Sequence, residues 1–385
     1  MISFNNIQVF LIILLMSFSS LKLIGQSYNT LFIGNSYTYV NDLPQLISGI
    51  ASSFGDTLNY DTSTPGGSTF NAHSTNSTTL TKISQQQWDY VILQAQSQEP
   101  SFSPGQVASQ TYPYAAILVD SIESNSSCTE AIFFMTWGRK YGDQMNCAAY
   151  PPICTYLGMQ QRLRESYLDM TLNHNATCSP VGMSWKESIA QDSTINLYTS
   201  DNSHPSIYGS YLAACTFYAT IFKESPIGST YIPNGIGHGT AVFLQTIASN
   251  TVLDSLSTWN IFNTDFSTVI IGDSVEFTNL SSNYESVLWN FGDGTQSILD
   301  NPSHVYLNSG IYNVKLTTFT NNSCISDIEN DTITITSTTA IEELKQEKKL
   351  IKITDILGRD TRIKKNVLLI YIYDDGSIEK RVILD

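Results

Sequence analysis

The chain has 385 residues, of which 42% are hydrophobic and 14% are charged. This balance supports packed cores in two or three domains and excludes an intrinsically disordered protein. Residues 1–340 carry 9 basic against 25 acidic groups, a net charge of −16. Such a surface repels phosphate backbones and anionic lipid, which excludes nucleic acid as a partner and favours neutral substrates.

The first segment of the chain is apolar. It runs from Ile7 to Phe18 and is followed by Lys22 and an expected cleavage site near Gly25. Its apolar core is short for a membrane span and is typical of a secretory signal. We therefore predict a signal peptide over residues 1–25, with an uncleaved anchor as the alternative.

Residues 26–258 alternate short apolar runs with helical patterns, which predicts βαβ units and a parallel sheet. Leu31–Ile33, Val91–Leu93 and Ile132–Met135 are continuous apolar runs, as expected for strands covered on both faces. A second strand is expected before Thr64. Apolar residues from Leu43 to Phe54 recur at helical spacing. The sequence thus predicts an α/β fold with helices on both faces of the sheet.

Two short motifs in this segment carry chemistry. Gly34-Asn35-Ser36 directly follows the first predicted strand, and Asp201 precedes His204 by three residues. Open α/β sheets bind ligands at the carboxyl ends of their strands, which is where this serine is expected. A serine, a histidine and an aspartate supply the nucleophile, the base and the group that orients the base in acyl transfer.

Six cysteines in an exported chain can form disulfides. Cys147 and Cys154 flank a Pro-Pro turn that can bring them together, and Cys128 with Cys178 is a looser possibility. Cys215 lies on the apolar face of a predicted helix and is expected to be a buried thiol. No cysteine or histidine cluster has metal-site spacing, so we expect no metal and no cofactor.

Residues 259–338 change to short alternating strands separated by turns, which predicts a β-sandwich. The run from Leu288 to Thr295, with His304, Tyr306 and Tyr312 downstream, resembles the polycystic kidney disease (PKD) domain. Asn290 stands where that family's motif usually has Asp. The resemblance implies a spacer or a carbohydrate-facing module without catalytic residues.

Residues 339–385 carry 10 of the 19 Lys and Arg residues of the chain and contain the β-like runs Ile353–Arg359 and Ile370–Ser377. They resemble the C-terminal sorting domain of type IX secretion. That resemblance implies export across both membranes of a Gram-negative bacterium and makes the secretion machinery a partner. An ordinary β domain is the alternative interpretation.

Residues 28–225 resemble the SGNH (GDSL-type) hydrolases, whose fold is a three-layer, flavodoxin-like α/β/α domain. The resemblance implies that Ser36 is the nucleophile, His204 the base and Asp201 the group that orients His204. It also implies an oxyanion hole formed by the N–H groups of Ser36 and Gly67 together with one glutamine side chain.

The chain departs from the SGNH pattern at two places. Asn35 replaces a common Asp, and no Gly-x-Asn-Asp follows the third strand. Leu93-Gln94-x-x-Ser97 instead resembles the sialate and acetyl-xylan esterases, so Gln94 is the expected oxyanion donor, with Gln96 or Gln98 as alternatives. His73 is expected at the surface rather than in the substrate pocket.

Together these features predict a secreted serine esterase that hydrolyses O-acetyl esters of carbohydrates, with an acylated small molecule or polysaccharide as substrate. Two alternatives remain. One is a lipase or thioesterase that acts on longer acyl chains, which a deep apolar pocket would favour. The other is a non-catalytic surface-binding or adhesion protein.

Overall fold

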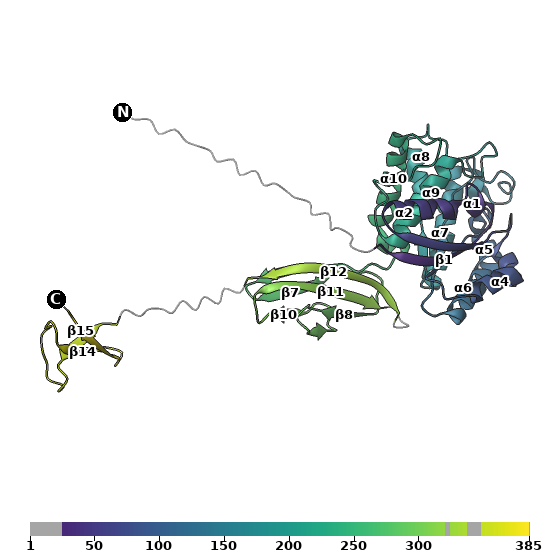
Figure 1. The fold of residues 1–385 in the computed structure, drawn as a ribbon. Coiled ribbons are helices and arrows are strands. Elements are labelled where there is room, and N and C mark those ends of the chain that lie inside the picture. The colour runs from purple at the N-terminus through teal and green to yellow at the C-terminus, as the bar shows by residue number, and fades with distance from the viewer. Residues whose placement is uncertain (1–24, 320–323, 337–347, 385) are drawn as a thin grey trace, which may run out of the picture.

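The computed structural model describes residues 25–319, 324–336 and 348–384, so the predicted signal peptide lies outside the described residues apart from Gly25. Figure 1 shows an α/β unit followed by a β-sandwich and a small C-terminal sheet. In the described part of the chain, no helix is long and apolar enough to cross a membrane.

A five-stranded parallel sheet with the order β2-β1-β3-β4-β5 forms the centre of the α/β unit. Its strands are β1 (Ser27–Ile33), β2 (Thr57–Ser63), β3 (Tyr90–Leu93), β4 (Glu130–Phe134) and β5 (Thr177–Ser179). β1, β3 and β4 coincide with the predicted apolar runs. β5 has three residues and only one hydrophobic side chain, and no apolar run predicted it.

Helices cover both faces of this sheet. One face packs against α2 (Leu43–Ser53), α8 (Val181–Gln191), α9 (Ile207–Phe222) and α10 (His238–Leu253). The other face packs against α3 (Phe70–Thr75), α4 (Ser77–Ser84), α6 (Tyr112–Asn125) and α7 (Tyr156–Asn173), with α5 (Pro104–Gln110) beside α6. The short helices α1 (Ser36–Tyr39), η1 (Glu99–Ser101), η2 (Pro151–Cys154) and η3 (Leu256–Trp259) lie in the connections.

Strand residues alternate between two hydrophobic cores. Phe32 and Ile92 belong to the core beneath α2 and α9, whereas Leu31, Ile33 and Val91 belong to the core beneath α6 and α7. Side chains of a strand point alternately to opposite faces, so an uninterrupted apolar run fills both cores at once. This arrangement confirms the predicted three-layer α/β/α fold.

The second unit is a sandwich of two antiparallel sheets, ordered β10-β7-β6 and β12-β11-β8-β9. Its strands are β6 (Phe266–Ile271), β7 (Ser274–Asn279), β8 (Ser286–Asn290), β9 (Gln296–Ser297), β10 (Ser303–Val305), β11 (Gly310–Phe319) and β12 (Ile325–Ile335). Trp289 is wholly buried between the sheets. The turn after it needs glycine, because Gly292 and Gly294 have φ angles of 79° and 93°.

Two disulfides are present, and one of them differs from the sequence-based expectation. Cys147 pairs with Cys154 as predicted. Cys128 pairs with Cys324 of the sandwich and not with Cys178, which is a buried free thiol like Cys215. Local spacing could not indicate a partner 196 residues away.

The last described unit is a three-stranded antiparallel sheet of β13 (Leu350–Thr354), β14 (Leu368–Tyr373) and β15 (Ile378–Val382). Only a few of its side chains are buried, among them Thr354, Leu369 and Tyr371. This unit therefore has a very small core of its own.

Candidate active site

Three side chains from two distant loops meet at the carboxyl end of the sheet. Ser36 begins α1 immediately after β1, and His204 lies in the loop before α9. The Nε2 atom of His204 is 2.9 Å from the Ser36 hydroxyl, and its Nδ1 atom is 2.5 Å from Asp201 Oδ2. The structure thus brings together the three predicted residues as a continuous chain of hydrogen bonds.

Asp201 is held as a carboxylate by the loop around it. Partial burial alone would raise the pKa of its carboxyl group, but hydrogen bonds outweigh this effect and hold the pKa well below its usual range. The donors are the His204 ring, the Thr199 hydroxyl at 2.8 Å, and the backbone N–H groups of Ser203 and His204, each at 2.9 Å. An ionised Asp201 keeps the proton of His204 on Nδ1, which leaves Nε2 free to accept the proton of Ser36.

Asn35 fixes the loop that carries the nucleophile. Its side-chain oxygen accepts from Tyr37 N at 3.1 Å and caps α1, while its Nδ2 donates to Ser68 O at 3.0 Å. A carboxylate could accept the first bond but could not donate the second. This geometry explains how an Asn serves at this position, where the SGNH pattern commonly has Asp.

Gln94 lies behind the nucleophile loop, which differs from the prediction that it donates to an oxyanion. Its side chain is wholly buried, and its Oε1 accepts from Asn35 N at 2.8 Å and from the Thr38 hydroxyl at 3.0 Å. A backbone N–H can only donate, so the atom facing Asn35 must be the oxygen. The amide nitrogen then faces Ala95 O, to which it donates. A buried amide with these partners ties the end of β3 to the nucleophile loop.

The side chains of the two alternative glutamines, Gln96 and Gln98, are also hydrogen-bonded. Gln96 Oε1 accepts from the backbone N–H groups of Gln98 and Glu99, at 2.7 and 3.2 Å. Gln98 Nε2 donates to Asp143 at 2.8 Å. In this conformation the amide nitrogens of Gln94, Gln96 and Gln98 donate to other acceptors, that of Gln96 to Gln98 Oε1 at 3.3 Å.

Gly67 lies in the loop that follows β2, beside the nucleophile loop. Its φ angle is +70°, a conformation that favours glycine, and nothing lies within 4 Å of the position that a Cβ would occupy. The bond from Asn35 Nδ2 to Ser68 O joins this loop to the residue before Ser36. The loop is thus anchored where the SGNH resemblance expects the second oxyanion donor.

His73 is buried, although the sequence predicted a surface residue. Its Nε2 lies 2.8 Å from Gly34 O and must carry the proton, because a carbonyl oxygen can only accept. Its Nδ1 then accepts from the Thr79 hydroxyl at 2.9 Å. Burial lowers the pKa of His73, which favours the neutral ring that this arrangement requires. His73 thus supports the nucleophile loop through its bond to Gly34 O. No motif surrounds His73 in the sequence, so the sequence could not indicate this role.

A stack of aromatic rings packs against His204, the proposed base. Trp185 stacks on Trp137 at 4.0 Å between ring centroids, Trp137 stacks on Tyr37 at 4.5 Å, and Tyr37 meets His204 edge-on at 5.6 Å. The Tyr37 hydroxyl lies 2.7 Å from the Ser203 hydroxyl, and Trp137 Nε1 donates to Ser203 O at 3.0 Å. Sequence analysis missed these positioning residues, because buried aromatics near a strand end look like ordinary core.

In the ranges that the structure describes, no three or more His, Cys, Asp or Glu side chains are grouped to hold a metal ion. A cavity of about 540 Å³ lies at the opposite edge of the sheet, lined by Tyr28, Glu130 and Ala176 of the α/β unit and by Cys324 and Asp327 of the sandwich. This cavity is separate from the Ser36 site, because it opens at the amino ends of the strands.

The fold of the α/β unit, a five-stranded parallel sheet with helices on both faces, resembles that of solved structures. It is similar to a DUF4886 family protein from Bacteroides uniformis, with a TM-score of 0.51 and 17% identity over 59% of this chain and 95% of that chain. A protein from Slackia heliotrinireducens that is assigned as an SGNH hydrolase is 22% identical over 51% of this chain and 100% of its own, with a TM-score of 0.42. These are likenesses of fold.

Residues 266–335 match the PKD domain family. The PKD1 domain of the Vibrio cholerae metalloprotease PrtV is 30% identical over 20% of this chain and 98% of that domain, with a TM-score of 0.19. No curated protein matches the chain. The second unit is thus a PKD domain that follows the α/β domain.

Proposed function

We propose that this protein is a serine esterase that hydrolyses carboxylic esters, with O-acetyl groups of carbohydrates as its substrates. The observation that carries the proposal is the hydrogen-bonded chain from Ser36 through His204 to Asp201. An ionised carboxylate, an imidazole and a hydroxyl in this order constitute the machinery of acyl transfer.

In the proposed mechanism, His204 Nε2 takes the proton of Ser36 as the hydroxyl oxygen attacks the ester carbonyl. Asp201 stabilises the imidazolium that forms, and His204 then returns the proton to the leaving alcohol. Water hydrolyses the acyl-enzyme by the same proton transfers in reverse. The N–H groups of Ser36 and Gly67 are the proposed donors to the oxyanion, since the N–H of a first helical residue has no acceptor within its helix.

Acetylated carbohydrates are favoured over long acyl chains by the openness of the site. The side chains of His204 and Asp201 are 36% and 47% exposed, so the pair lies near the surface rather than at the bottom of a deep apolar pocket. The PKD domain and the predicted export of the chain are consistent with an extracellular polysaccharide. We include in the proposal that residues 339–385 direct the protein to type IX secretion.

A serine-directed test addresses the proposed nucleophile. We expect Ser36→Ala to lower kcat on 4-nitrophenyl acetate by at least about 10⁴-fold with an unchanged unfolding midpoint, because the nucleophile of the triad is lost. A fluorophosphonate should label the wild-type protein at Ser36 and should leave the variant unlabelled. Ser109→Ala, on the exposed helix α5, is the matched control and should retain full activity. A folded Ser36→Ala protein with wild-type turnover would refute the proposal.

A further inference from the structure

The loop that follows β4 lies against the loop that carries the proposed base. Tyr198 donates from its hydroxyl to Gly138 O at 2.7 Å, and Lys140 N donates to Asn202 O at 3.0 Å. Trp137, the residue before Gly138, is part of the aromatic stack that reaches His204. Arg139 is therefore held at the edge of the sheet where Ser36 lies.

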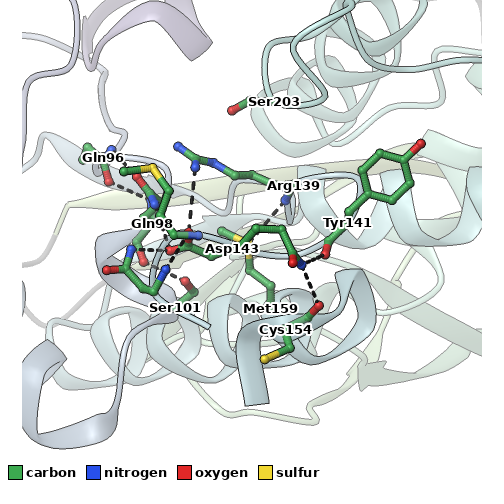
Figure 2. Close-up of polar contacts among 12 residues, drawn as sticks. Gln96, Gln98, Ser101, Arg139, Tyr141, Asp143, Cys154, Met159 and Ser203 are labelled. Atoms are coloured by element: carbon green, nitrogen blue, oxygen red, sulfur yellow. Dashed lines mark hydrogen bonds and ion pairs between the residues drawn. The ribbon is translucent and has the colours of Figure 1, made fainter. Parts of the chain in front are cut away.

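Asp143 organises this loop. It is wholly buried, and its carboxylate accepts four bonds, from Gln98 Nε2, Asn146 Nδ2 and the backbone N–H groups of Met145 and Asn146. Figure 2 shows these contacts converging on Asp143, with Arg139 extended above it. The Cys147–Cys154 disulfide closes the loop. The backbone around Arg139 is therefore fixed before any ligand binds.

Within residues 25–319, 324–336 and 348–384, no acceptor forms a hydrogen bond with the guanidinium of Arg139. Its Nη1 lies 3.8 Å from Asp143 Oδ1, a distance that makes an ion pair but is too long for a hydrogen bond. The four N–H donors already occupy the lone pairs of that carboxylate. Among the described residues, the buried Nε of Arg139 finds no partner, and the side chain remains 24% exposed. Buried donors without a partner are rare and call for an explanation.

The charge of Arg139 also reaches the residue next to the nucleophile. Burial raises the pKa of Tyr37, and the positive charge of Arg139 opposes that rise. Ser203, which precedes His204, bonds the Tyr37 hydroxyl, and Asn202 before it accepts a bond from Lys140 N, next to Arg139. A cation with unused donors thus lies beside both catalytic loops of a strongly acidic chain.

We propose that Arg139 binds a carboxylate of the substrate, so that the esterase selects acetylated sugar acids over neutral sugars. The planar guanidinium can donate two parallel hydrogen bonds to a carboxylate, which a neutral hydroxyl cannot accept in the same way. The net charge of the chain repels anions at long range, so a fixed local cation is needed to hold one at this site. This inference rests on the proposed esterase function and adds a substrate class to it.

Two esters that differ only in the carboxylate test the inference. They are 4-nitrophenyl glucuronide and 4-nitrophenyl glucoside, each acetylated at the same hydroxyl and assayed by acetate release. We expect Arg139→Gln to lower the ratio of kcat/KM for the acid over the neutral sugar by roughly 10- to 100-fold, the range for a lost charge-assisted hydrogen bond. The ratio for Arg139→Lys should fall between those of the wild type and Arg139→Gln, because lysine keeps the positive charge but lacks the two parallel donors of the guanidinium.

Lys140→Gln is the matched control, because it removes an adjacent positive charge, whose Nζ donates to Asn196 Oδ1 at 3.2 Å. Its ratio should stay within about twofold of wild type, since an exposed charge contributes little. An unchanged ratio in Arg139→Gln, or an equal loss on both esters, would overturn the inference.

A binding experiment separates this inference from the esterase proposal. Hydrolysis of 4-nitrophenyl acetate reports on the esterase function alone. Calorimetry of Ser36→Ala with glucuronate and with glucose reports on the anion site even if no ester is turned over. The inference is supported if Ser36→Ala binds glucuronate but not glucose, and if the Ser36→Ala/Arg139→Gln protein no longer binds glucuronate. Equal titrations with and without Arg139 contradict it.

Discussion

Gln94 shows how one buried amide can serve a catalytic loop without touching the substrate. Its oxygen is the acceptor for Asn35 N, one residue before Ser36, and for the Thr38 hydroxyl, two residues after it. The side chain therefore sets the position of the proposed nucleophile. Because the amide is inaccessible, its removal should act first on stability and only through it on turnover.

We expect Gln94→Ala to lower the free energy of unfolding by about 1–3 kcal/mol, the cost of leaving buried donors without an acceptor. The kcat of the folded protein should fall by less than about tenfold, well under the loss expected for an oxyanion donor. The kcat and the urea midpoint should be measured together, with Gln96→Ala as the control. A loss of 10²-fold or more in kcat at an unchanged midpoint would restore Gln94 as an oxyanion donor.

Glu99 is the residue whose ionisation should couple stability to pH. Burial raises the pKa of its carboxyl group to about 7, from an ordinary value of 4.5. The folded protein therefore binds the proton more tightly than the unfolded chain does. The contribution of Glu99 to stability is greatest below pH 4.5 and is lost as the pH rises toward 7.

Glu99→Gln should remove this pH dependence, because the neutral amide carries no charge to bury. Its urea midpoint should exceed that of the wild type at pH 8 and should differ less at pH 5. Glu123→Gln is a suitable control, because its side chain is exposed and lies on α6. A variant that is no more stable than the wild type at pH 8 would contradict the burial of an ionised Glu99.

At the level of elements, the junction between β1 and α1 is built around the absence of a side chain at Gly34. A Cβ on Gly34 would lie 2.5 Å from Thr38 Oγ1 and 2.7 Å from Gln94 Oε1. Both atoms belong to the hydrogen bonds that position Ser36. The glycine of the Gly-Asn-Ser motif is thus needed for close packing.

Gly34→Ala should lower the free energy of unfolding by about 1–3 kcal/mol through overpacking and should reduce esterase activity with it. Gly105→Ala, in α5, is the matched control, because nothing lies within 4 Å of its Cβ position. The control should be neutral or stabilising by about 0.5–1 kcal/mol, since alanine is the better helix former. Equal midpoints for the two variants would show that the junction adapts without cost.

The sequence indicated those elements whose signal is local. Apolar runs predicted β1, β3 and β4, and the Gly-Asn-Ser and Asp-x-x-His motifs placed Ser36 and His204 at one edge of a sheet. β5 was missed because three residues are too few to show a period. The orientation of Gln94 and the burial of His73 depend on loops that meet only in the folded chain. Residue type alone therefore could not show whether Gln94 donates to the oxyanion or supports the nucleophile loop.

At the level of the whole molecule, the Cys128–Cys324 disulfide joins the PKD domain to the amino-terminal edge of the sheet. Cys128 lies two residues before the start of β4, and an ion pair of 3.2 Å between Lys223 and Asp327 lies between the same two units. The proposed active site lies at the opposite edge. The sandwich therefore supports the α/β domain without contributing to the site.

We expect the double variant Cys128→Ser/Cys324→Ser to lose roughly 2–5 kcal/mol of stability, the range for removing a native disulfide that closes a long loop. Its kcat on 4-nitrophenyl acetate should stay within about twofold of wild type at 25 °C. Thermal unfolding and initial rates on the same preparation check both statements. A large loss of turnover in the folded variant would show that the two edges of the sheet are coupled.

The sandwich is attached at the amino-terminal edge of the sheet, and this affects how the proposed esterase would meet an insoluble polysaccharide. The seven residues of β1 span about 23 Å at roughly 3.3 Å per residue, and this length separates the two edges. A PKD domain that gripped one polysaccharide strand would hold Ser36 facing away from that strand. The proposed esterase would then act on neighbouring strands, so that each binding event removes acetyl groups around the bound strand rather than from it.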